Sequence, residues 1–202
     1  MSAPILWILK GNVCVHNLKA ITPLGGTSPK IDRFEGLVIS ENVDRALTSV
    51  AARQGREAEC CSAVQATLGL VLPKPGKWSA EGAYMAWWMG VDLWMIDADH
   101  ADHELLAAHV KTVVGVAASV AEQTDGWCRF DVSGARAMDV FERLCNLNLR
   151  AGGTGDAHRA SIEHLGCFVL CLEAGVKYAV IGPRSSAGSL RHALVTTAQS
   201  VI

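Results

Sequence analysis

The sequence predicts an α+β fold with two similar β-α-β-β-α halves, in which antiparallel sheets carry helices packed on one face. First, the chain has 202 residues, half of them hydrophobic, which is enough to bury roughly 70% of the surface that the unfolded chain exposes. Second, short apolar runs with strand-like alternation are followed by longer runs with helical spacing. Third, when Gly55 is aligned with Gly134, strand, helix, strands and helix recur in the same order, which is typical of antiparallel sheet covered by helices.

The chain is predicted to consist of an N-terminal arm, residues 1–32, and a single domain, residues 33–202. The arm contains the stretch "ITPLGGTSPK", whose Gly, Pro and Thr residues favour irregular structure. The domain is predicted to consist of two pseudo-repeats, at about 43–118 and 119–202.

The first pseudo-repeat begins with a predicted strand in "VDRALTSVAARQG" and a helix that ends at Gly69. The inner face of this helix is predicted to contain Ala58, Cys61, Val64, Gln65 and Leu68. Two apolar runs, "YMAWW" and "VDLWMIDA", predict a hairpin joined around Met89 and Gly90. A second helix is expected in "DHADHELLAAHVKTVVGVA", with Asp99 or Asp102 as its N-cap. Its predicted inner stripe is Leu105, Leu106, His109, Val110 and Val113.

The second pseudo-repeat begins with a strand in "GWCRFDVSG". Alternation places Trp127, Arg129 and Asp131 on one face and Cys128, Phe130 and Val132 on the other. A helix is expected in "ARAMDVFERLCNLNL", followed by the Gly-rich loop "RAGGTGD" and up to three strands. These strands lie in "HRASIEHLG", "CFVLCLEAG" and "KYAVIG", and the final helix lies in "SSAGSLRHALVTTAQSV".

Charge and composition argue against several classes of partner. The formal net charge is −2 and basic residues form no cluster, so that nucleic acid is not an expected partner. No apolar run approaches the roughly 20 residues of a membrane span, and "MSAPILWILKGNV" lacks the features of a signal peptide. We expect no membrane partner and a cytoplasmic location.

No catalytic, cofactor or metal site is predicted on the chain. The seven cysteines include no C-x-x-C pair, and buried thiols are favoured over a metal site at His164, Cys167 and Cys171. The stretch "VIGPRSSAGSLRHAL" matches neither a phosphate-binding loop nor a nucleophile elbow, which favours Ser185 or Ser186 as a helix cap. The cluster of acidic and histidine residues from Asp97 to His103 is likewise interpreted as helix capping.

The tryptophans predict a surface for partners. Trp87 and Trp88 are adjacent in a predicted strand and must face opposite sides, and an outward Trp is a typical anchor of an interface. The predicted partner interface consists of Trp87, Trp88, Trp127, Arg129 and Arg184.

Several blocks of sequence together resemble the gamma subunit of heterotetrameric sarcosine oxidase. They are "SVAARQGRE", "LGLVLPKPG", "DGWCRFDVSGARAMDVFERLCNLNLR", "IEHLGCFVL" and "GPRSSAGSLRHAL". The resemblance runs from about Thr22 to Ile202. More distantly, the chain is similar to the folate-binding part of the glycine-cleavage aminomethyltransferase (T-protein) family, in which a "DVSG" strand also leads into a helix. This second resemblance implies the same doubled α+β architecture.

The first resemblance implies a structural, non-catalytic subunit of an oxidoreductase complex. Such a complex oxidatively demethylates sarcosine to glycine, producing hydrogen peroxide and, with tetrahydrofolate, methylenetetrahydrofolate. The implied partners are the alpha, beta and delta subunits. FAD, covalently held FMN, NAD, zinc and tetrahydrofolate are implied on those subunits, and no cofactor is implied on this chain.

The chain departs from the T-protein pattern where that family has a Gly-Gly turn and an acidic pair. The corresponding stretch is "HLGCFVLCLE", in which the five positions after Gly166 offer no carboxylate for general acid/base catalysis. Two alternatives remain open. The chain is a stand-alone folate-binding protein of the aminomethyltransferase type, or it is an interaction subunit of a related flavin oxidase, for example one acting on dimethylglycine.

Overall fold

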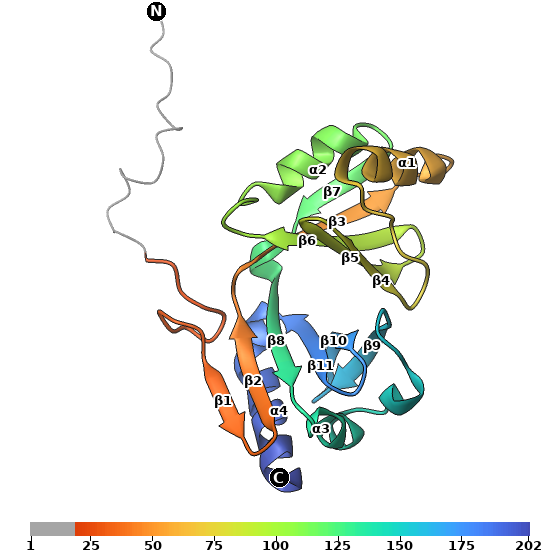
Figure 1. Cartoon of the computed structure of the whole chain (residues 1–202). Helices are drawn as coiled ribbons and strands as arrows, with labels where there is room; N and C mark the ends of the chain where they lie inside the picture. The colour runs from red at the N-terminus through yellow and green to blue at the C-terminus, as the bar shows by residue number, and fades with distance from the viewer. Residues whose placement is uncertain (1–18) are drawn as a thin grey trace, which may run out of the picture.

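The computed structural model describes residues 19–202 of the chain (Figure 1). Most of the predicted N-terminal arm, residues 1–18 with Trp7 and Cys14, lies outside the described residues. In the described part, the chain forms two antiparallel sheets, which we call sheet A and sheet B.

Sheet A takes its strands from the two ends of the described chain, and sheet B takes its strands from the middle. In spatial order, sheet A consists of β1 (Ile31–Phe34), β2 (Leu37–Asn42), β8 (Trp127–Ser133), β11 (Lys177–Pro183), β10 (Leu165–Glu173) and β9 (Ala157–Ile162). Sheet B consists of β4 (Trp78–Glu81), β5 (Tyr84–Gly90), β6 (Leu93–Asp99), β3 (Arg45–Ala52) and β7 (Ala118–Glu122).

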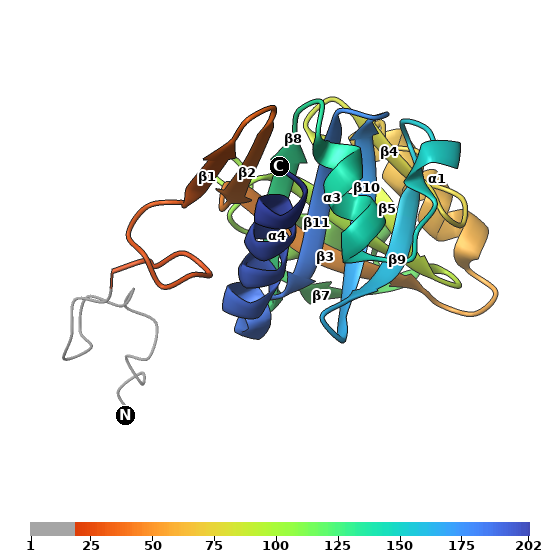
Figure 2. The same ribbon diagram turned by 90° about the horizontal axis from the view of Figure 1, so that it is seen from below.

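Each sheet has helices on one face. α1 (Glu57–Leu68) and α2 (Leu106–Val114) pack on sheet B, while α3 (Ala137–Leu144) and α4 (Ala187–Val201) pack on sheet A. Figure 2 shows α3 and α4 together on one face of sheet A, in front of its strands. Short 3-10 turns precede β8 and α4 and follow α3, at η1 (Thr124–Gly126), η3 (Arg184–Ser186) and η2 (Leu149–Ala151). The predicted fold class is confirmed, and each half has three strands between its two helices.

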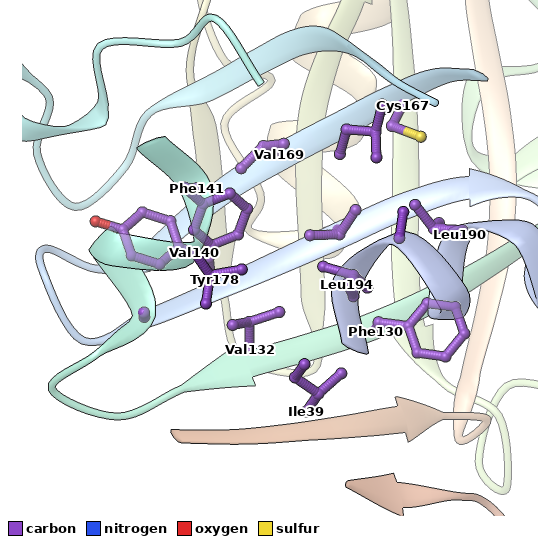
Figure 3. Close-up of a cluster of buried hydrophobic side chains, with 14 of the residues drawn as sticks. Ile39, Phe130, Val132, Val140, Phe141, Cys167, Val169, Tyr178, Leu190 and Leu194 are labelled. Carbon is purple, nitrogen blue, oxygen red and sulfur yellow. The ribbon is translucent and has the colours of Figure 1, made fainter. Parts of the chain in front are cut away.

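The other faces of the two sheets pack against each other. Leu47, Trp87 and Met95 of sheet B meet Phe168 and Ile181 of sheet A in this inter-sheet core. The layers therefore run from helices to sheet B, sheet A and helices. A larger core lies between sheet A and its helices (Figure 3), and it includes Phe130, Val132, Phe141, Tyr178 and Leu194.

Strand β8 shows how the sequence produces these layers. Its buried and partly exposed residues alternate along the whole strand, as predicted. Phe130 and Val132 point into the core under α3 and α4, whereas Trp127 and its neighbours on the other face point toward sheet B. Period-2 alternation assigns the two faces of β8 to two different environments.

The chain crosses between the sheets twice, so that β1 and β2 join the later strands in sheet A and β7 joins the earlier strands in sheet B. β2 is followed directly by β3, yet β2 pairs with β8 in sheet A while β3 pairs with β6 and β7 in sheet B. β7 is followed by β8, and the chain returns from sheet B to sheet A. The predicted repeat boundary near residue 118 coincides with the start of β7. We call this arrangement the strand exchange.

The predicted inner face of α1 is wrong in detail. The residues that α1 buries are Cys60, Val64 and Leu68, whereas Ala58 and Gln65 are exposed. The buried residues recur every fourth position, which gives a narrow stripe rotated away from the predicted one. Gly69 ends the helix as predicted, in a left-handed conformation with φ of 71°.

Helix α2 begins later than the sequence predicts. No side chain caps it, because Asp99 still belongs to β6 and accepts a hydrogen bond from the backbone N–H of Ala101, outside the helix. Leu105, predicted to face inward, is 73% exposed, and His109 is exposed.

Two turns also differ from their predictions. The β5–β6 hairpin turns at Val91 and Asp92, where Asp92 has a φ of 51°, and not at Met89. At the start of α4, neither Ser185 nor Ser186 caps the helix with its side chain, because the 3-10 turn η3 leads into it.

Candidate functional site

A cavity of about 330 Å³ opens at the end of the molecule where β3 begins and β6 ends. Its walls come from both sheets and from η1 and η3, and the segment before β1 closes one side. The lining residues are Ala20, Ile21, Thr22, Pro23, Thr27, Pro29, Asn42, Val43, Arg45, Leu47, Asp97, His100, Thr124, Asp125, Trp127, Cys128, Arg129, Ile181 and Arg184.

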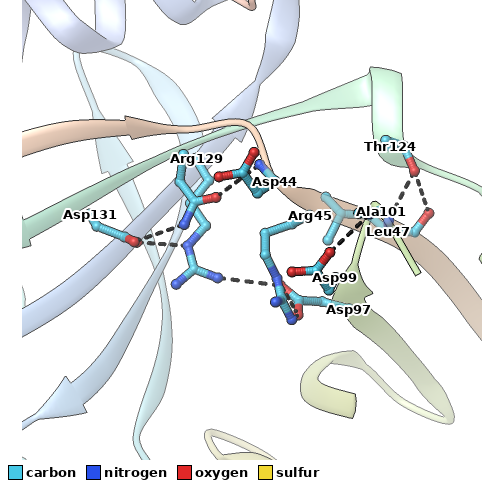
Figure 4. Close-up of polar contacts among 10 residues, drawn as sticks. Asp44, Arg45, Leu47, Asp97, Asp99, Ala101, Thr124, Arg129 and Asp131 are labelled. Carbon is cyan, nitrogen blue, oxygen red and sulfur yellow. Dashed lines mark hydrogen bonds and ion pairs between the residues drawn. The ribbon is translucent and has the colours of Figure 1, made fainter. Parts of the chain in front are cut away.

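Asp97 is the most deeply buried charged group of this lining. It follows Met95 on the inter-sheet face of β6, and its side chain is 0% exposed. Arg45 donates to Oδ1 of Asp97 through Nε, at 3.0 Å, and through Nη2. Arg129 donates to Oδ2 through Nη1, at 3.3 Å. Figure 4 shows both guanidinium groups directed at this carboxylate.

The same ion pairs join the two sheets. Arg45 and Asp97 belong to sheet B, whereas Arg129 belongs to sheet A, where its Nε donates to Asp131 at 2.7 Å. Asn42 of β2 donates to the other oxygen of Asp131 at 2.9 Å. The polar network therefore extends across the inter-sheet space at the point where the chain passes from β2 to β3.

Burial and ion pairing act in opposite directions on Asp97. Removal from water raises the pKa of Asp97, while the guanidinium groups of Arg45 and Arg129 oppose this rise. A buried charge that loses its partner costs about 3–5 kcal/mol, so that the arginines are required wherever Asp97 is ionised. The network is a stabilising element of the site as well as part of its wall.

The segment before β1 forms a roof over the cavity, and it is fastened by a buried glutamate. The carboxylate of Glu41 accepts hydrogen bonds from the backbone N–H groups of Leu24 and Lys30, each at 3.0 Å. Glu41 is 4% exposed. On the other side, Nη2 of Arg184 donates to the carbonyl oxygen of Ile21 at 3.0 Å. We call residues 20–30 the roof segment.

Another part of the wall is apolar. Leu47, Trp127 and Ile181 reach the cavity from the inter-sheet faces of β3, β8 and β11. Trp127 packs against Phe168, with 5.8 Å between ring centroids, and its indole N–H donates to Gln123 at 3.0 Å. The cavity thus combines a fixed aromatic surface with a charged end.

The structure divides the predicted partner interface. Trp127, Arg129 and Arg184 lie together in the lining of the cavity. Trp87 is 0% exposed between the sheets, so it has no surface to offer a partner in this fold, and that part of the prediction is wrong. Trp88 lies on the opposite face of β5 and is partly exposed.

Other residues singled out in the sequence do not form a site. His103 and His109 lie near Tyr84, whose hydroxyl is 3.3 Å from Nε2 of His109. Across residues 19–202, no group of three His, Cys, Asp or Glu side chains is placed to hold a metal ion. In the same residues, no helix is long and apolar enough to cross a membrane.

The buried cysteines Cys128 and Cys167 are poor nucleophiles. Burial raises the pKa of Cys128, which lines the cavity, to about 11, and that of Cys167 to about 12. Since the thiolate is the reactive form, these groups are unreactive at neutral pH. The cavity offers charged groups, hydrogen-bond donors and apolar surface for binding.

Sequence reasoning missed Asp97 and Arg45 as parts of a site. Asp97 was grouped with the acidic and histidine residues that follow it, although it lies inside the apolar run "VDLWMIDA". An aspartate on the inner face of a buried strand requires a cationic partner, and that was the available signal. The packing of the two sheets decides which arginine pairs with Asp97.

Comparison with known proteins shows the fold. No protein-family model matches the chain, and no curated protein matches its sequence. Among solved structures, a chain of the heterotetrameric sarcosine oxidase from Corynebacterium sp. U-96 is similar, with a TM-score of 0.72 and 16% identity. The match covers 85% of this chain and 88% of that chain.

A second solved structure is similar over a shorter part of its length. It is the glycine cleavage system aminomethyltransferase T from Bartonella henselae, with a TM-score of 0.57 and 14% identity. The match covers 77% of this chain and 44% of that chain, so this chain spans less than half of the aminomethyltransferase. The predicted likeness in fold to both proteins is confirmed.

Proposed function

We propose that the chain is a non-catalytic subunit of a heterotetrameric sarcosine oxidase. In this role it supports the complex that demethylates sarcosine oxidatively, and its partners are alpha, beta and delta subunits. FAD, FMN, NAD, zinc and tetrahydrofolate belong to the other subunits in this proposal. The complex is an oxidoreductase, and the role of this chain is to hold the complex together.

One observation carries the proposal, namely the extent of the two structural matches. The fold corresponds to 88% of a single chain of a heterotetrameric sarcosine oxidase, but to only 44% of the aminomethyltransferase. More than half of that enzyme has no counterpart in these 202 residues. A shared fold does not by itself imply a shared function, so the near full-length correspondence with one polypeptide favours the subunit role.

The chemistry of the cavity agrees with a non-catalytic role. Its buried carboxylate, Asp97, is held by two arginines. Its thiol, on Cys128, has a pKa raised to about 11 by burial. General acid/base catalysis requires a group that exchanges protons near neutral pH. The thiol of Cys128 is not such a group, and the carboxylate of Asp97 is engaged by Arg45 and Arg129.

Co-purification tests the proposal. The affinity-tagged full chain is co-expressed with the alpha, beta and delta subunits of sarcosine oxidase from the same organism. We expect a stable complex with all three, which carries flavin absorbance and oxidises sarcosine. A purified chain that elutes as a monomer, with no flavin-bearing partner under these conditions, contradicts the proposal.

The alternative of a stand-alone folate-binding protein makes a different prediction. Calorimetric titration of the purified chain with tetrahydrofolate would then show binding without any other subunit, as the 0.57 TM-score to the aminomethyltransferase allows. A subunit of a related flavin oxidase would instead form the complex and prefer dimethylglycine to sarcosine as substrate. The same co-purified complex distinguishes these two outcomes.

A further inference from the structure

We propose that the cavity under the roof segment binds a small organic anion with a flat apolar body, such as an aryl carboxylate. This inference goes beyond the subunit role and does not depend on it. It rests on the size of the cavity, on its aromatic wall and on the unused donors at its charged end.

The cavity has the size of a small-molecule site. Its volume is about 330 Å³, at the lower end of the roughly 300–1,000 Å³ that is usual for such sites. It lies at the junction of two sheets and is covered by the roof segment, which Glu41 holds through two backbone N–H groups. A preformed cavity of this size accepts a ligand of one or two rings.

The apolar wall suits a flat body. Leu47 and Ile181 line the cavity together with Trp127, and the hydrogen bond from Trp127 to Gln123 fixes the orientation of the indole. Aromatic groups favour offset stacking or edge contact with such a surface. The wall therefore favours an aryl group over a flexible polar chain.

The arginines retain donors for an anionic group. An arginine has five N–H donors on three nitrogens. Arg45 uses Nε and Nη2 on Asp97, and Arg129 uses Nε and Nη1 on Asp131 and Asp97. Nη1 of Arg45 and Nη2 of Arg129 have no hydrogen-bond partner within residues 19–202. Because Asp97 fixes both guanidinium planes, these donors are held in place before a ligand arrives.

The charge balance favours an anion over a neutral ligand. Asp97 and Asp131 offset the charges of Arg45 and Arg129. Within residues 19–202, Arg184 forms its ion pair with Asp125, at 3.5 Å, and the side chain of Asp125 is 92% exposed. An ion pair so exposed is screened by water and contributes little. Glu41 adds a negative charge at the roof segment, but the lining itself contains three arginines and two aspartates. Arg184 therefore leaves positive charge at the edge of the cavity, beside the apolar wall.

Calorimetry with two matched probes tests this inference. The full chain, alone or in the complex with which it purifies, is titrated with 2-naphthoate and with its neutral analogue 2-naphthamide. We expect one molecule of 2-naphthoate per chain, bound at least tenfold more tightly than 2-naphthamide. Equal affinity for the two probes, or binding of neither, overturns the inference.

Two variants locate the binding. Arg184→Met removes the positive charge at the edge of the cavity without disturbing the ion pairs of Asp97, but it also removes the hydrogen bond to the carbonyl oxygen of Ile21. Binding of 2-naphthamide reports any change in the roof segment, and we expect 2-naphthoate to lose about tenfold more affinity than 2-naphthamide. Arg150→Met removes a more exposed arginine, which pairs with Glu142 and Asp139 outside the lining. It should leave both affinities unchanged. If the two variants behave alike, the anion does not bind at this cavity.

The proposed function and this inference fail separately. Loss of co-purification with flavin-bearing subunits removes the subunit role but leaves the naphthoate titration informative. Conversely, a chain that assembles with those subunits and binds neither probe keeps the subunit role and loses the anion site.

Discussion

Asp156 shows how a single carboxylate holds the open edge of the two-sheet sandwich. It precedes β9 in sheet A, forms an isolated antiparallel bridge with Lys77 before β4 of sheet B, and accepts a side-chain bond from Lys77. It also accepts the backbone N–H of Gly153 at 2.7 Å. The bond from Lys77 and then that from Gly153 lower the pKa of Asp156 below its ordinary value of 3.8.

The substitution Asp156→Asn is expected to destabilise the protein at neutral pH and not in acid. A carboxylate whose pKa is lower in the folded state stabilises that state above its unfolded pKa, and the contribution disappears as pH falls through the folded value. We expect the variant to lose about 1 kcal/mol of unfolding free energy at pH 7, since Lys77 is half exposed. The difference should shrink as pH falls below 3.8.

Urea unfolding at pH 7, 5, 4 and 3 measures this difference. Asp102→Asn, at an exposed position before α2, is the matched control, and it should show no difference at any pH. A loss in Asp156→Asn that is as large at pH 3 as at pH 7 would show that charge is not the cause.

At the scale of residues, the face of a strand on which a side chain lies was predictable from the sequence. The residue that this side chain contacts was not. The alternation of β8 correctly places Trp127, Arg129 and Asp131 on one face, because the strand period is a local property. That Arg129 meets Asp97, 32 positions away, depends on how two sheets are stacked. No pattern within either strand specifies that distance.

At the scale of elements, two glycines that align in the sequence have different environments. Gly55 and Gly134 both have positive φ, at 79° and 128°. A Cβ on Gly55 would meet nothing within 4 Å, whereas a Cβ on Gly134 would lie 2.2 Å from the carbonyl oxygen of Gly36. Gly134 ends β8 at the point where the β1–β2 turn crosses it.

The two alanine substitutions are therefore expected to differ. Gly55→Ala should cost about 1–2 kcal/mol, because only the left-handed backbone is strained. Gly134→Ala should cost more than about 3 kcal/mol, because two backbone segments must also separate. Thermal or urea unfolding of both variants provides the measurement, and equal losses would contradict a specific contact between Gly134 and Gly36.

Elements were predicted well, and their ends less well. The helices α1 to α4 all lie where helical spacing occurs. The start of α2 was misplaced because acidic residues such as Asp99 and Asp102 are favourable both in helix caps and in turns. The buried stripe of α1 was misplaced because Ala58 and Cys61 are compatible with either face, so packing against α2 and β3 decides.

At the scale of the whole molecule, the strand exchange makes each half incomplete by itself. Without residues 116–202, sheet B lacks β7, and β2 lacks β8, its partner over five register positions. Without residues 1–115, β8 has one unpaired edge. A sheet edge of unpaired N–H and C=O groups favours association.

Separated halves are expected to fold only together. We propose to divide the chain after Gly115, which has positive φ and open space around it between α2 and β7. Fragments 1–115 and 116–202 should each lack a cooperative thermal transition, while the co-expressed pair should co-purify and show one. The intact chain is the reference. A cooperative transition in either isolated fragment would mean that the exchanged strand is dispensable for folding.

The doubled order of elements was predictable, but the strand exchange was not. Local periodicity of apolar residues predicts where strands and helices lie, and the order of strand, helix, strands and helix follows from these positions. Which strand lies beside β3 depends on pairing across the chain, and β2 is equally suited by its alternation to either sheet. The cavity, which forms where the chain crosses from β2 to β3, was hidden for the same reason.

The strand exchange also sets an order of events during synthesis. Val38 of β2 pairs with Ser133 of β8, so that β2 leaves the ribosome well before the strand that covers it exists. At the usual elongation speed of about 5–20 residues per second, this delay is on the order of 5–20 seconds. During that time Leu37 and Ile39, which end up buried, are open to chaperones or to other nascent chains. The topology that ties the finished molecule together therefore makes the unfinished chain dependent on protection.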